Sequence, residues 1–133
     1  MKGVERKSPS GSLFPYYYKN GALHCLKYGS YYRNEDALLE TIEREERFFI
    51  ESGERLNVWI DLYCTRISGR VLDRLIGNLC AIAPQARRIA IVMGASPLSE
   101  LRIKSRLRRR PELSDTAIRF FRDPEDAKTW IVV

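Results

Sequence analysis

The fold of this chain is decided by the stretch Asn57-Val58-Trp59-Ile60-Asp61-Leu62 and by a second run, Ile89-Ala90-Ile91-Val92-Met93, one helix length later. Both runs are short, apolar and rich in β-branched residues, which favours strands over helices. Runs that are apolar on both faces are typical of central strands in a parallel sheet, because helices cover such a sheet. We therefore predict that residues 57–62 and 89–93 are adjacent or near-adjacent parallel strands with one helix between them.

The composition fits one soluble domain. The chain has 133 residues, of which 44% are hydrophobic and 30% are charged, and this length is enough for one buried core. The apolar runs are too short to span a membrane, and the polar N-terminus lacks the apolar middle of a signal peptide. We therefore expect a flexible tail at residues 1–12, one domain at residues 13–133, and a cytoplasmic location.

The first part of the domain carries a hairpin signal. Residues 13–18 and 22–28 are β-prone, and Asn20-Gly21 between them accepts positive φ at low cost. Pro15 removes one ladder donor, so the strand at residues 13–18 belongs at a sheet edge. The sequence thus predicts an antiparallel edge hairpin.

Helix signals then recur along the chain. Each expected helix follows a residue that caps N-termini well, and these residues are Asn34, Ser68, Ser96 and Asp123. Gly53, Pro84 and Pro111 end the first three helices, and residues 117–121 supply a last strand. Together these signals predict a single α/β domain with a mixed, mostly parallel sheet of about five strands, flanked by about four helices.

Charge is divided between two of the expected helices. The net charge is +6, with acids concentrated in residues 34–54 and bases in residues 85–110. The acids of the first helix are expected on its solvated face. The third helix and the turn after it supply five candidate contacts for a polyanion: Arg102, Arg106, Arg108, Arg109 and Arg110. The alternatives are a solvated basic face, or a homodimer in which this helix meets the acidic helix of the other copy.

The loops at the carboxyl ends of the strands are the expected binding edge, because ligands of open α/β sheets meet the sheet there. The candidate residues in these loops are Arg66, Ser68, Gly69, Arg70, Gly94 and Ser96. Ser68 precedes the second helix, where free backbone N–H groups and the two arginines would favour an anion or a phosphate on the serine. The alternative is that Ser68 is an N-cap only.

No catalytic constellation is evident. The chain lacks a glycine-rich phosphate loop, a serine nucleophile elbow and zinc-ligand spacing. Its three cysteines are Cys25, Cys64 and Cys80, and His24 is the only histidine. His24 and Cys25 are adjacent strand residues, so their side chains are expected on opposite faces. The sequence therefore predicts no catalytic residue, no metal ligand and no cofactor, although a small enzyme built on Asp61 and Cys64 is a third alternative.

Three segments carry a family resemblance. They are Val58-Trp59-Ile60-Asp61-Leu62, Arg88-Ile89-Ala90-Ile91-Val92 and the ending from Ile118 to Ile131, which contains Phe120-Phe121-Arg122-Asp123-Pro124-Glu125-Asp126-Ala127 and Trp130. From about Leu13 to Val133 the chain resembles the STAS superfamily, which sulfate transporters and anti-sigma-factor antagonists share, and it is most similar to the SpoIIAA-like branch.

The resemblance implies a mixed sheet with an antiparallel edge strand, and a non-enzymatic module that binds proteins or small ligands. In anti-sigma-factor antagonists a kinase phosphorylates a serine in the loop after the central strand. Ser68-Gly69 lies in a similar place, so the resemblance makes Ser68 a phosphorylation candidate.

The function predicted from the sequence is a non-catalytic regulatory module that contacts a protein or a small ligand through its strand-end loops. The alternative is an anion-binding module that uses its arginine-rich third helix on an anionic membrane or a nucleic acid. A protein partner is expected, and its identity is left open by the sequence.

Overall fold

The computed structural model describes residues 6–19, 21–29, 34–63, 65–94 and 97–132. Its centre is a five-stranded sheet in the order β3-β4-β5-β6-β7. The strands are β3 (Tyr16–Tyr18), β4 (Gly21–Lys27), β5 (Leu56–Asp61), β6 (Ala86–Val92) and β7 (Ala117–Phe121). β3 pairs antiparallel with β4, and all later pairs are parallel. The predicted mixed sheet with an antiparallel edge hairpin is therefore confirmed, although Asn20 of the hairpin turn lies outside the described residues.

The two runs that decide the fold are neighbours, as predicted. Val58 lies opposite Ile89, and Ile60 lies opposite Ile91, in parallel register. The side chains of all four residues are fully buried, because helices cover this face of the sheet. Each strand begins earlier than the apolar pattern indicates, at Leu56 and Ala86.

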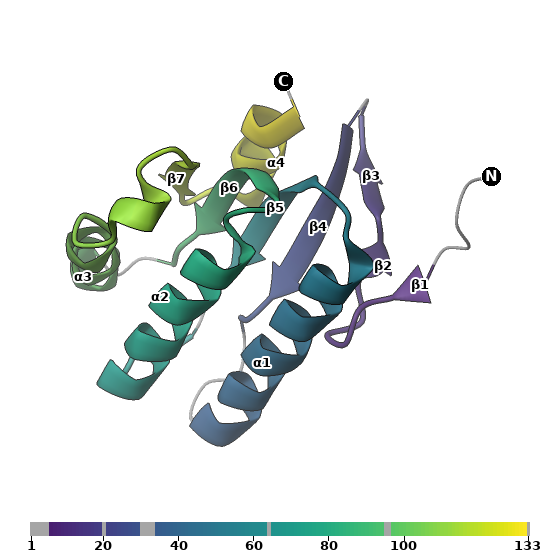
Figure 1. The fold of residues 1–133 in the computed structure, drawn as a ribbon. Coiled ribbons are helices and arrows are strands. Elements are labelled where there is room, and N and C mark those ends of the chain that lie inside the picture. The colour runs from purple at the N-terminus through teal and green to yellow at the C-terminus, as the bar shows by residue number, and fades with distance from the viewer. Residues whose placement is uncertain (1–5, 20, 30–33, 64, 95–96, 133) are drawn as a thin grey trace.

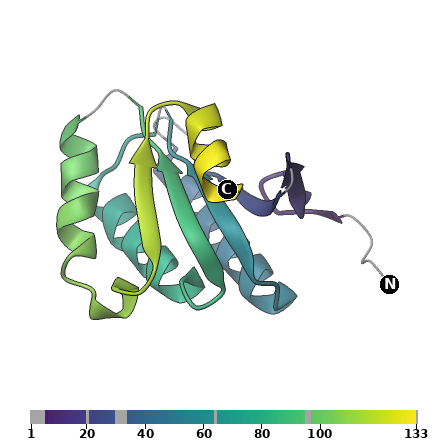
Figure 2. The same ribbon diagram turned by 90° about the horizontal axis from the view of Figure 1, so that it is seen from above.

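The described helices lie unequally on the two faces of the sheet (Figures 1 and 2). They are α1 (Glu35–Ser52), α2 (Gly69–Ile82), α3 (Pro97–Leu107), the single 3-10 turn η1 (Pro111–Leu113), and α4 (Pro124–Val132). The helices α1, α2 and α3 share one face and one core, whereas α4 alone packs on the other face. Because the strands follow chain order, each crossover helix lies beside the strands that it connects.

The smaller core under α4 contains Trp59. Its side chain is 6% exposed and lies in a cluster with Cys25, Ala127 and Ile131. The ammonium group of Lys128 lies 4.7 Å from the centre of the Trp59 ring. The large apolar side chain at the middle of β5 therefore anchors the last helix to the sheet.

The expected helix ends are largely confirmed. Asn34 accepts a hydrogen bond from Ala37 N–H at 3.2 Å, and Gly53 ends α1 with a φ of 67°. Ser68 caps α2. The expected N-cap of α3, Ser96, lies outside the described residues, and α3 begins at Pro97.

The N-terminal segment differs from the expected flexible tail. Strand β1 (Arg6–Lys7) pairs antiparallel with β2 (Leu13–Phe14), so Pro15 divides the single predicted strand into two that belong to different sheets. Ser8 Oγ and Ser10 N–H donate to Glu45 Oε2 at 2.8 and 2.9 Å. The described part of the tail is therefore held against α1, by a residue that is distant in sequence.

Glu45 also differs from the expectation that the acids of the first helix face solvent. Its side chain is fully buried, and its Oε1 lies 3.2 Å from Nε2 of the equally buried His24. The His24 ring stacks on Phe49, with ring centres 5.0 Å apart. His24 is thus a core residue with one nitrogen facing a carboxylate, while Cys25 faces the opposite core under α4.

Candidate functional site

Ser68 and Gly69 begin α2 at the carboxyl edge of the sheet. Ser68 Oγ accepts from Val71 N–H at 3.2 Å, which is the expected N-cap contact. The same hydroxyl donates to the carboxylate of Glu35 at the start of α1. Both functions of the hydroxyl, donor and acceptor, therefore have partners within the domain.

Arg70 is the second expected member of this site. Its guanidinium lies 2.8 Å from a Glu35 oxygen and 3.2 Å from an Asp36 oxygen. Two carboxylates therefore already pair with this arginine, and they would compete with a phosphate on Ser68. Arg66 is exposed, but Glu35 beside the hydroxyl would repel a phosphate dianion. These contacts favour the alternative that Ser68 is a cap.

The loop that follows β5 is tied to its neighbours. Thr65 Oγ1 donates to Tyr28 O at 2.7 Å, and Asp61 Oδ1 accepts from Tyr63 N–H at 2.9 Å. Gly94 follows β6 and is half-buried, whereas Ser96 lies outside the described residues. The Asp61 carboxylate thus closes a local turn, and Cys64, its partner in the third alternative, also lies outside the described residues.

The five arginines expected to contact a polyanion fall into two groups. Three have partners: Arg102 Nη1 donates to Ile67 O at 2.7 Å, Arg106 pairs with Asp73, and Arg110 lies 3.9 Å from a Glu112 oxygen. Arg108 and Arg109 are exposed and form no ion pair with a described residue. Arg102 and Arg106 therefore attach α3 to α2 and to the loop before it. Arg108 and Arg109 remain available to a ligand among the described arginines of this run.

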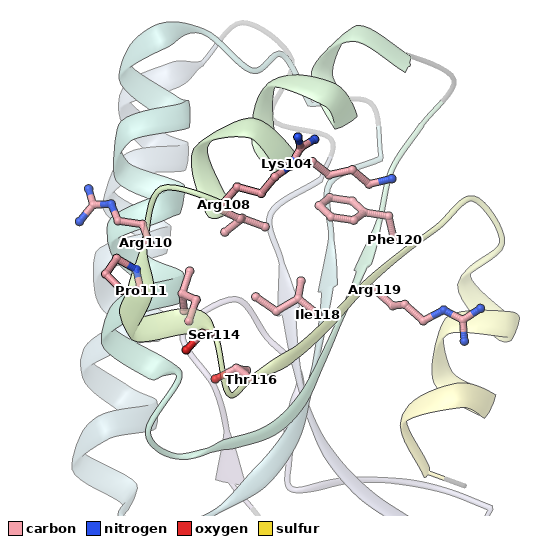
Figure 3. Close-up of a pocket in the computed structure, with 11 residues that line it drawn as sticks. Lys104, Arg108, Arg110, Pro111, Ser114, Thr116, Ile118, Arg119 and Phe120 are labelled. Carbon is pink, nitrogen blue, oxygen red and sulfur yellow. The ribbon is translucent and has the colours of Figure 1, made fainter.

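A groove lies between α3, η1 and β7. We call it the edge groove, and it encloses about 630 Å³. Figure 3 shows its walls, and its lining residues are Lys104, Leu107, Arg108, Arg110, Pro111, Leu113, Ser114, Thr116, Ile118, Arg119 and Phe120. None of these eleven residues is acidic, so the groove combines an apolar floor with a basic rim.

The floor and the rim come from different elements. Ile118 and Phe120 point from β7 toward α3, while Lys104 projects from α3 and Arg108 from the turn that follows it (Figure 3). The ammonium group of Lys104 lies 5.2 Å from the Phe120 ring centre and 2.8 Å from a Glu100 oxygen. Arg119 projects to the other face of the sheet, toward α4, where its guanidinium stacks on aromatic rings.

Sequence reasoning did not predict the edge groove, although it singled out Arg108 and Arg110 on its rim. The floor draws side chains from α3, η1 and β7, whose proximity depends on how α3 packs on α2. One local signal was available: the alternation of Ile118, Arg119 and Phe120 indicates a strand with one apolar and one basic face.

Among the described residues, no group of three or more histidine, cysteine, aspartate or glutamate side chains could hold a metal ion. No described helix is long and apolar enough to cross a membrane. Comparison with protein-family models, with curated proteins and with solved structures found no match to this chain. The function is therefore inferred from the arrangement of the chain's own side chains.

Proposed function

We propose that this chain is a cytoplasmic, non-catalytic, STAS-like binding module whose partner is a protein segment with apolar and acidic side chains. The observation that carries the proposal is the edge groove, with its apolar floor, its basic rim and no acidic lining residue. Apolar side chains of a partner would be buried against Ile118 and Phe120, and acidic ones would meet the cations around them. The antiparallel edge strand of the mixed sheet supports the STAS-like part of the proposal.

The edge groove is a better candidate than the strand-end loops. In those loops Ser68 is hydrogen-bonded to Glu35, and Arg70 forms ion pairs with Glu35 and Asp36. A partner that binds these two residues would have to displace contacts within the domain. Arg108 on the groove rim has no such competitor among the described residues. A partner that binds Arg108 therefore does not have to displace an ion pair of this arginine within the described part of the chain, which favours affinity.

A non-catalytic role is supported by the state of Cys25, the cysteine that adjoins the single histidine of the sequence. Burial raises the pKa of the Cys25 thiol to about 12, so this thiol stays protonated at neutral pH. His24, the neighbouring imidazole, belongs to the core on the other face of the sheet and cannot act as its base.

The test compares two adjacent arginines. A short, end-blocked, fluorescent peptide in which valine alternates with aspartate is titrated against the wild type, Arg108→Glu and Arg109→Glu. Both variants change the net charge equally, but only Arg108 lines the groove. We expect Arg108→Glu to weaken binding about fivefold, equivalent to about 1 kcal/mol, and Arg109→Glu to bind like the wild type.

The outcomes distinguish binding in the edge groove from general attraction of the peptide by the protein's positive charge. Equal weakening by both variants would mean that general positive charge attracts the peptide, and the edge groove would then not be the site. A peptide that alternates valine with lysine is the control for apolar binding alone, and we expect no measurable binding from it.

An anionic membrane is a second candidate partner, favoured by one observation. Leu98 and Leu101 on α3 are 72% and 55% exposed, on the same helix that ends near Arg108 and Arg109. Exposed leucines beside arginines are typical of helices that lie in a membrane interface. In flotation with phosphatidylserine vesicles, Leu98→Asp should abolish recovery of protein that the wild type shows. Equal recovery of both proteins would remove this candidate.

A further inference from the structure

The outer edge of β7 is an open side of the sheet. β7 is the last strand in the order, and its described pairing is with β6 only. Phe121 O accepts from Met93 N–H at 2.8 Å, so the backbone groups of Phe121 and, two residues earlier, Arg119 face β6. Since backbone groups alternate in direction along a strand, those of Ile118 and Phe120 face outward. Two donors and two acceptors are therefore directed away from the sheet.

The edge groove runs beside this open edge. Helix α3 lies alongside β7 rather than across it (Figure 2), and Ile103 is its one buried residue among those described. The space between α3 and β7 is the cavity of about 630 Å³. Side chains of an added strand would therefore find space on the α3 face, next to the floor residues Ile118 and Phe120.

We infer that the partner segment binds as an extended strand added to the outer edge of β7, with apolar side chains toward α3 and acidic side chains toward Arg119. This inference rests on the proposed function and specifies its geometry. Successive side chains of a strand point to opposite faces, and β7 itself presents Ile118 and Phe120 on one face and Arg119 on the other. An added strand of alternating apolar and acidic residues is complementary to both faces at once.

The charge of the edge favours an acidic peptide over other extended chains. Arg119 is exposed at the middle of β7, and Lys104 and Arg108 stand on the α3 side. An inward or exposed charge on an edge strand opposes pairing with a neutral or basic strand, including β7 of a second copy. The same charges attract a strand that carries carboxylates, so the edge discriminates between partner strands by the sign of their charge.

The experiment removes backbone donors from the probe without changing its side chains. The valine–aspartate peptide is made in two further forms, with N-methyl groups on alternate residues, so that each form is blocked along one of its two edges. A strand on β7 uses one edge only. We expect one form to lose at least about tenfold in affinity, as loss of two or more hydrogen bonds of about 1 kcal/mol each implies, and the other form to bind like the parent peptide.

Amide exchange provides the protein-side readout. With the parent peptide bound, the outward amides of Ile118 and Phe120 should exchange with solvent at least several-fold more slowly than in the free protein. Binding of both methylated forms with the parent's affinity would overturn strand addition while leaving the proposed function intact. Failure of the parent peptide to bind at all would overturn both.

Discussion

The buried side chain of Glu45 joins three segments of the chain: helix α1, the sheet and the N-terminal segment. It contacts His24 in the sheet and accepts hydrogen bonds from Ser8 and Ser10 in the N-terminal segment. Burial acts to raise the pKa of this carboxyl, but His24, Ser10 and Ser8 together outweigh burial and lower the pKa below its usual value. The ionised form of Glu45 is therefore the one that the fold stabilises.

The pH dependence of Glu45 follows from the direction of that shift. A carboxyl whose folded pKa is depressed adds stability above its unfolded pKa of about 4.3, and this stability is lost as the pH falls through the folded pKa. Glu45→Gln should lower the free energy of unfolding by about 3 kcal/mol at pH 7, because it leaves His24 without its carboxylate. The difference from the wild type should shrink below about pH 4.

The matched control is Glu43→Gln on the same helix. Glu43 is exposed and pairs with Arg47 one turn later at 3.0 Å, so we expect a change of at most about 0.5 kcal/mol at either pH. Urea unfolding of the three proteins at pH 7 and at pH 3.5 measures both effects, the lower value being set just under the ordinary pKa of about 4.3. A Glu45→Gln deficit that is equally large at both pH values would contradict the assigned ionised state.

Individual residues were predictable where their contacts are local. Asn34 caps the start of α1 and Gly53 caps its end, as expected, because each cap forms its hydrogen bond within its own helix. Trp59 is buried as expected, since it lies inside an apolar run. Glu45 was not predictable, because in the helical pattern it is one acid among many, and its serine partners lie 37 and 35 residues away in sequence.

The N-terminus of helix α2 carries a prediction at the scale of an element. Ser68 caps it, and Glu35 from α1 faces the same hydroxyl. Asparagine and aspartate cap equally well, so Ser68→Asn and Ser68→Asp differ only in charge. We expect Ser68→Asp to be less stable than Ser68→Asn by about 0.5–1 kcal/mol through repulsion from Glu35, in thermal unfolding at neutral pH.

A second substitution identifies the source of that difference. In a Glu35→Gln background the two Ser68 variants should become equally stable, because the repelling carboxylate is gone. If the stability difference persisted, another charge would be its source. If Ser68→Asp became the more stable variant, the arginines around the loop would be stabilising the added negative charge. Ser68→Ala should cost about 1 kcal/mol in either background.

Helix α3 marks the limit of prediction for elements. Its start at Pro97 and its basic character follow from the sequence, whereas it ends at Leu107, before the expected stop at Pro111. The role of each base does not follow from the sequence. Arg102 and Arg106 look like Arg108 and Arg109 in the pattern, yet they bind Ile67 and Asp73 of the preceding unit. Those partners become neighbours only when α3 packs against α2, so the pattern overstates the free charge.

For the whole molecule, the sequence predicts the architecture well and the binding surface poorly. Two-sided apolar runs and helix caps are local signals, and they were enough for the sheet, its edge hairpin and the four helices. The edge groove depends instead on space left between elements. Its volume is set by how far α3 stands from β7, which no local pattern encodes.

The order of the strands in the sheet repeats their order in the chain from β3 to β7. During translation, each new strand can therefore pair with the one made just before it, and none has to insert between two strands already joined. Loop closure then involves one helix at a time, which keeps its entropy cost small. After β7, helix α4 packs on the other face of the sheet and adds no further strand at this edge. A partner strand bound at the outer edge of β7 would therefore extend the sheet by one more strand, in the same order in which the chain's own strands were added.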